Sequence, residues 1–252
     1  MKAPIRKPRR ELPISHLLPN LVTVAAICAG IAAIRFSAEG NFSIAVQLVM
    51  LAGILDGIDG RLARMLKSES ALGAELDSLA DFLNFGVAPA LLMYFWAFQD
   101  MRNAGWVAVT IYVLCCVLRL ARFNVTSKAR ESQGPERHFT GVPSPAGAFL
   151  VMLPLFLSFA LRENWPVVHG GLIAAYTIFV GLMMISRIPT FSPKSLTIRR
   201  ENVRYLYIGF VGVIAGLLSF PWATLVVLDL AYFGLVLWGW RKLRPQPETD
   251  TP

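Results

Sequence analysis

The sequence predicts an all-α protein, a polytopic membrane helix bundle, and three observations support this fold class. Of the 252 residues, 55% are hydrophobic and only 16% are charged, and the mean hydropathy is +0.55. The apolar residues gather in eight segments, most of them near the ~20 residues that a helix needs to cross a bilayer. Short turn-forming stretches such as Gly40-Asn41 separate these segments. This composition indicates a membrane protein rather than a large soluble core.

We expect the eight helices, in chain order, at residues 18–38, 42–66, 73–98, 105–125, 144–162, 167–188, 204–219 and 221–240. Pro19 suits the first turn of the first helix. In the third helix, Gly86 and Pro89 are expected to allow close packing or a bend. The fourth helix ends in an arginine-rich stretch, and a polar, turn-rich loop at 137–146 precedes the fifth. The seventh segment is short, so the number of spans at the C-terminal end stays open.

The basic residues predict the orientation of the chain in the membrane. An even number of spans places both termini on one side, together with most of the 24 lysine and arginine residues. Only Arg35, Arg102 and Arg162 fall on the other side. Basic loops face the cytoplasm, so we expect both termini there. The net charge of +8 is then explained by loops that face anionic lipid, and no nucleic acid partner is expected.

The two ends of the chain are predicted to lie outside the bundle. Residues 1–17 form a basic segment without a small-residue cleavage site, so no removable signal peptide is expected. Residues 201–244 supply the last two helices. The tail at 245–252 contains Pro, Glu and Thr and is expected to be disordered.

Four aspartates within the second and third apolar segments are the strongest functional signal. Asp56 and Asp59 are three residues apart, and Asp77 and Asp81 are four apart, so each pair lies on one face of its helix. An ionised group at membrane depth costs ~2.5–3.5 kcal/mol on insertion scales. Four carboxylates brought together would repel one another unless hard divalent cations bind them. The spacing therefore predicts a metal site, and a site with two metals suits phosphoryl transfer.

The residues between the aspartates indicate a ligand beside them. Gly60 and Ala63 lie on or near the acidic face, where their small size leaves room for a ligand or a neighbouring helix. Arg64 is one turn beyond Gly60 and could bind a phosphate oxygen.

Together these residues resemble the signature of the CDP-alcohol phosphatidyltransferase family, D-x2-D-G-x2-A-R-x8-G-x3-D-x3-D, which here runs from Asp56 to Asp81. The resemblance implies a six-helix core within residues 18–200, extended here by about two C-terminal helices. It implies Mg²⁺ or Mn²⁺, in two sites, as cofactor and Asp81 as the base nearest the acceptor alcohol. The residues implied as metal ligands are Asp56, Asp59, Asp77 and Asp81. Those implied near the nucleotide are Asn20, Thr23, Gly60, Ala63, Arg64 and Gly73.

Further motifs narrow the resemblance. Four stretches resemble the membrane-integral bacterial phosphatidylserine synthases of that family. They are LPNLVT near the first helix, RLARFN at the end of the fourth, FTGVPSPAGA and ISRIPTFS. Such an enzyme would transfer a phosphatidyl group from CDP-diacylglycerol to L-serine and release CMP at the bacterial inner membrane, commonly as a homodimer. Serine needs a cation for its carboxylate, and Arg119 and Arg122, on one helix face, are candidates for this role.

Two other functions remain open from the sequence. The acceptor could be another alcohol, such as glycerol 3-phosphate or an inositol phosphate. A divalent-cation transporter with a carboxylate-lined path is an alternative of a different class. Its support is weaker because the acidic residues cluster toward one membrane face and only Asp229 is found in the other apolar segments. We expect Asp229 to pair within the bundle rather than to join the acidic cluster.

Overall fold

The computed structural model describes residues 17–130, 139–161, 169–186, 189–190 and 203–242. The predicted basic segment before Leu17 and the tail at 245–252 lie outside these residues. The elements in chain order are α1 (Leu18–Ala38), α2 (Phe42–Met65), α3 (Ala71–Asp81), the π-helix η2 (Phe82–Val87), α4 (Ala88–Ala97), α5 (Arg102–Arg130), β1 (Phe139–Thr140), α6 (Ser144–Leu161), α7 (Gly170–Ile185), β2 (Pro189–Thr190), α8 (Val203–Ser219) and α9 (Pro221–Lys242).

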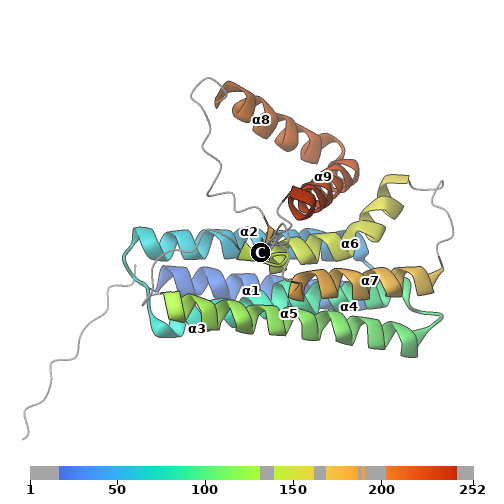
Figure 1. Cartoon of the computed structure of the whole chain (residues 1–252), viewed down its shortest axis with the longest axis horizontal. Coiled ribbons are helices and arrows are strands. Elements are labelled where there is room, and N and C mark those ends of the chain that lie inside the picture. The colour runs from blue at the N-terminus through green and yellow to red at the C-terminus, as the bar shows by residue number, and fades with distance from the viewer. Residues whose placement is uncertain (1–16, 131–138, 162–168, 187–188, 191–202, 243–252) are drawn as a thin grey trace, which may run out of the picture.

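The prediction of an all-α membrane bundle is confirmed. Six helical runs in the described part of the chain are long and apolar enough to cross a membrane: α1, α2, the continuous run α3–η2–α4, α5, α6 and α9. The apolar helix α7 and the apolar part of α8 are shorter. In Figure 1 the helices α1 to α7 form an elongated bundle, α9 packs on α6, and α8 extends away from the bundle beyond α9.

Small side chains bring α1 and α2 close together. These two helices form the most extensive contact between elements in the described part of the chain. Both bury alanine and other small residues: Ala26, Ala29 and Ala33 on α1, and Ala45, Val49 and Ala52 on α2. Small residues let helix backbones approach closely in lipid, where packing and not the hydrophobic effect drives helix association. This tight pair holds α1 and α2 side by side.

The third span differs from a regular helix directly after Asp81. Residues 82–87 adopt π-helical geometry, which the sequence did not predict. Within this segment Asn84 is fully buried, and neither of its amide atoms has a hydrogen-bond partner among the described residues. Gly86 is also buried, and a Cβ added to it would lie 3.1 Å from the Cys116 Sγ atom. The close packing expected of Gly86 is therefore present, against α5.

A short antiparallel ladder joins the segment before α6 to the segment after α7. Phe139 pairs with Thr190 and Thr140 pairs with Pro189, so the described part of the predicted polar loop at 137–146 is held to the segment after α7. Gly141 follows with φ of +85°, and a Cβ added there would lie 2.6 Å from the Met184 carbonyl oxygen. Only glycine fits this position, because its φ is positive and the backbone of α7 is so near.

Candidate active site

The acidic residues are held by two helices and the turn between them. At the end of α2 the chain turns through Lys67, whose φ is +50°, and the Ser68 amide donates to the Ala63 carbonyl oxygen at 3.0 Å. Ser70 then caps α3, since its Oγ accepts from the Gly73 amide at 3.0 Å. This tight reversal sets the C-terminal half of α2 next to α3 and brings the two aspartate pairs together.

Three of the four aspartates form one compact cluster. One carboxylate oxygen from each of Asp56, Asp59 and Asp77 lies within 4.8 Å of the others. Asp59 is 3% exposed, and one oxygen of Asp56 and one of Asp59 are buried without a hydrogen-bond partner among the described residues. Buried carboxylate oxygens with no donor are what a hard divalent cation requires. These residues therefore fit a metal ion.

Asp81 lies beside the cluster, at the junction of α3 and η2. Its carboxyl group contacts that of Asp56. Two carboxyl groups this close need a shared proton or a cation between them. The π-helix begins at the next residue, and π-helical turns in α-helices are frequent at functional sites.

Thr23 orients Asp59 from α1. The Thr23 hydroxyl lies 2.6 Å from one Asp59 carboxylate oxygen and 3.1 Å from the carbonyl oxygen of Pro19. Both Thr23 and Asp59 are buried, so this hydrogen bond is shielded from water. The sequence placed Thr23 near the nucleotide, and the structure shows in addition that it contacts the acidic cluster.

A pocket of about 530 Å³ adjoins the cluster. Asp59 and Asp77 form its acidic wall. All the residues implied near the nucleotide line it: Asn20, Thr23, Gly60, Ala63, Arg64 and Gly73. The turn between α2 and α3 completes it through Ser68, Glu69 and Ser70, which the sequence pattern did not single out. A serine before a helix with a glycine three residues later is the signal that could have identified Ser70.

The small residues of the pocket differ in what surrounds them. A Cβ added to Gly73 would lie 2.9 Å from Asn20 Oδ1 and 3.1 Å from Ser70 Oγ, so Gly73 makes room for both side chains. A Cβ added to Gly60 would meet no atom within 4 Å. Gly60 therefore borders open space. The exposed Arg64 donates from Nε to the Gly60 carbonyl oxygen at 2.9 Å, which holds its guanidinium group at the pocket wall.

The two arginines expected to hold the acceptor have different surroundings. Arg119 is half-buried and donates from Nε to the Val142 carbonyl oxygen at 2.6 Å and from Nη1 to Ser144 Oγ at 2.7 Å. Its charge also lies close enough to Asp81 for direct attraction. Arg122 is exposed and donates from Nη1 to the Ile185 carbonyl oxygen at 2.9 Å, at the end of α7. Of the pair, Arg119 is the one near the acidic residues.

Asp229 lies buried on α9, where it is 5% exposed. One of its carboxylate oxygens is buried with no hydrogen bond to any described residue, while its charge interacts with Tyr176 of α7. That it pairs within the bundle therefore stays a prediction. The expectation that it stands apart from the acidic cluster agrees with the geometry, since it does not contribute to the group of Asp56, Asp59 and Asp77.

Residues 16–187 match the sequence model of the CDP-alcohol phosphatidyltransferase family. The chain belongs to this family. The match contains the four aspartates, the pocket and both arginines, whereas α8 and α9 lie beyond it.

Relatives in the family are similar to this protein over most of its length. A CDP-diacylglycerol–serine O-phosphatidyltransferase of Mycobacterium tuberculosis is 33% identical over 98% of this chain and 88% of its own length. One from Helicobacter pylori, with the same name, is 32% identical over 79% of this chain and 82% of its own. An archaetidylserine synthase of Methanothermobacter thermautotrophicus is 34% identical over 68% of each chain. Each of these three enzymes has a name that includes serine.

Proposed function

We propose that the protein is a phosphatidylserine synthase, which transfers the phosphatidyl group of CDP-diacylglycerol to the hydroxyl of L-serine and releases CMP. The observation that carries this proposal is the acidic cluster beside the 530 Å³ pocket, in a chain similar over nearly its whole length to relatives with that name. The reaction joins the serine oxygen to phosphorus and breaks the bond to CMP. The serine proton passes to a base.

Asp56, Asp59, Asp77 and Asp81 are the residues that would hold Mg²⁺ or Mn²⁺, in two sites. Divalent ions supply charge neutralisation at the reacting phosphate and at the leaving CMP. The carboxylates of the first three converge within 4.8 Å, and the buried oxygens of Asp56 and Asp59 without donors support this assignment. Asp81 contacts Asp56 at the edge of the cluster, where it can also accept the proton of the serine hydroxyl.

The pocket is assigned to the nucleotide half of CDP-diacylglycerol. Asn20 and Ser70 offer polar groups at one wall, and Gly60 leaves open space for the ligand. Arg64 presents its guanidinium group to the pyrophosphate. Arg119 and Arg122 are assigned to the serine carboxylate, and Arg119 is supported further by its position near Asp81.

The membrane setting follows from the same proposal. The distribution of lysine and arginine supports a chain in the bacterial inner membrane with both termini and the pocket facing the cytoplasm. A homodimer is proposed from the family resemblance alone.

The function is tested with the purified protein, CDP-diacylglycerol and Mn²⁺, by measuring CMP release with one acceptor at a time. L-serine should give CMP and phosphatidylserine in equal amounts, and no reaction should occur with EDTA. CMP release with glycerol 3-phosphate or an inositol phosphate, but not serine, would assign another acceptor. No CMP release with any acceptor, combined with Mn²⁺ uptake by vesicles that contain the protein, would support the transporter instead.

A separate prediction follows from the hydrogen bond between Thr23 and Asp59. Thr23→Val keeps the side-chain shape but leaves Asp59 free to rotate, so the Mn²⁺ concentration for half-maximal activity should rise roughly tenfold or more. Thr110→Val is the matched control, because the Thr110 hydroxyl also bonds to a carbonyl oxygen four residues earlier but is exposed on α5. An unchanged Mn²⁺ requirement in Thr23→Val would show that Asp59 needs no orientation from α1.

A further inference from the structure

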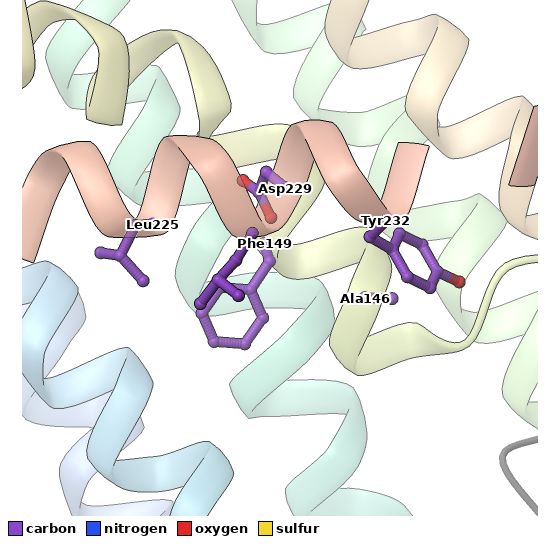
Figure 2. Close-up of a pocket in the computed structure, with 6 residues that line it drawn as sticks. Ala146, Phe149, Leu225, Asp229 and Tyr232 are labelled. Carbon is purple, nitrogen blue, oxygen red and sulfur yellow. The ribbon is translucent and has the colours of Figure 1, made fainter. Parts of the chain in front are cut away.

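Helix α9 lies outside the part of the chain that matches the family, yet it packs on α6 near the candidate acceptor region. Between α6 and α9 is a second pocket of about 230 Å³, lined by Ala146, Phe149, Leu225, Leu228, Asp229 and Tyr232. Figure 2 shows this pocket with α9 above it and the first turns of α6 below. Two of the lining residues, Asp229 and Tyr232, carry polar groups at a depth where polar groups are costly.

The burial of the Tyr232 hydroxyl group is not explained by any hydrogen bond within the described part of the fold. Its oxygen is buried and has no hydrogen-bond partner among the residues that the structure describes. A buried hydroxyl without a partner costs ~1–3 kcal/mol, so it is rarely kept without a use. In Figure 2 the hydroxyl is directed away from Asp229, past Ala146 in the first turn of α6. The Tyr232 hydroxyl is therefore not positioned to interact with Asp229.

Arg119 reaches the same end of α6 from α5. Its Nε and Nη1 atoms are fixed by Val142 and by Ser144, the first residue of α6. Its Nη2 atom has no hydrogen bond to any described residue. The Arg119 charge interacts with both the Tyr232 oxygen and Asp81. Arg119 is thus near Tyr232 as well as Asp81, the residue beside the acidic cluster.

These groups share one electrostatic character. Arg119 is a cation whose guanidinium plane is already fixed, and Tyr232 is a neutral donor with an unused proton. The beginning of α6 adds partial positive charge from its unpaired amide groups. A fixed cation, a helix N-terminus and a free hydroxyl suit an oxyanion. Asp81, whose charge also interacts with Arg119, suits the hydroxyl end of the same ligand.

We propose that Tyr232 of α9 and Arg119 of α5, at the start of α6, form an oxyanion site that binds the carboxylate of the acceptor amino acid. This inference rests on the proposed function and adds a specificity-determining residue from outside the family-matched region. The Arg119 Nη2 atom and the Tyr232 hydroxyl each donate to one carboxylate oxygen. The acceptor is thereby oriented with its hydroxyl toward Asp81.

The test is the steady-state kinetics of Tyr232→Phe, which removes the hydroxyl and keeps the ring against Ala146. The KM for serine should rise about tenfold or more, as expected for a lost hydrogen bond to a charged group. The KM for CDP-diacylglycerol and the rate at saturating serine should stay near wild type. Tyr207→Phe is the matched control, because Tyr207 is exposed on α8. Arg119→Lys, which keeps the charge but loses the planar fork, should raise the serine KM as well.

A second measurement separates carboxylate binding from a structural role. Ethanolamine is serine without its carboxylate, so its inhibition constant against serine should be the same in wild type and Tyr232→Phe. A rise in the KM for CDP-diacylglycerol instead of serine would assign the oxyanion to the lipid phosphate and overturn the proposal. A serine KM within twofold of wild type would also overturn it. If wild type itself does not use serine, the proposed function fails first, and the two failures are distinguishable.

Discussion

Asp77→Asn is expected to reduce phosphatidyl transfer by at least ~1,000-fold, because it removes one of the three carboxylates that converge at the proposed metal site. Asp77 is the carboxylate that α3 contributes to the group of three, and the other two come from α2. The change to asparagine keeps the shape but removes a charge that a divalent ion requires. In the described part of the chain, no further acidic residue joins this group to replace it.

The measurement is CMP release at saturating Mn²⁺, CDP-diacylglycerol and serine. Asp100→Asn is the matched control, since Asp100 is an exposed carboxylate beyond the end of α4, far along the chain from the cluster. The thermal midpoint of Asp77→Asn should not fall below that of wild type in EDTA, because removing one charge relieves repulsion among the carboxylates. Activity within tenfold of wild type would contradict the metal assignment.

Gly60→Leu is expected to lower kcat/KM for CDP-diacylglycerol at least ~100-fold while the protein stays folded. A Cβ added at Gly60 meets no protein atom within 4 Å, and Gly60 lines the 530 Å³ pocket, so the leucine side chain is expected to extend into that pocket. Leucine also favours a helix over glycine by ~0.8–1.0 kcal/mol. Loss of activity would therefore come from blocked binding and not from unfolding.

Gly57→Leu is the control that isolates this effect. Gly57 is exposed on the same helix, one turn earlier, and a Cβ added there also meets no atom within 4 Å. It is not among the described residues that line the pocket. CMP should raise the thermal midpoint of wild type and Gly57→Leu but not that of Gly60→Leu. Equal protection of all three proteins would place the nucleotide elsewhere.

The sequence predicted the helices and the meeting of the acidic residues because both depend on local periodicity. Helical spacing puts Asp56 on one face with Asp59, and Asp77 on one face with Asp81. The short polar link between the two helices makes them run antiparallel. The π-helix after Asp81 was not predictable in this way. It depends on how Asn84 and Gly86 meet α1 and α5, which lie far away in the sequence.

Contacts between distant segments also explain the other features that the sequence did not predict. The ladder between β1 and β2 joins residues that are about 50 positions apart and involves only two pairs, too few for a strand pattern. The position of Arg119 beside Val142 and Ser144 is set by tertiary packing rather than by the arginine-rich pattern that drew attention to it. The orientation of Tyr232 toward the start of α6 likewise depends on where α9 docks, and no local signal in α9 specifies that.

The close pairing of α1 and α2 through small residues bears on how the protein is made. These helices are neighbours in the chain and are joined by a turn of three residues, 39–41, so they can leave the insertion machinery as a preassembled hairpin. Asp59 enters lipid with its hydrogen bond from Thr23 already available, whereas Asp56 and Asp59 gain their third carboxylate only when α3 is synthesised. The proposed ion-binding centre would therefore be completed after its first half is embedded, and metal capture is expected to be a late event in biogenesis.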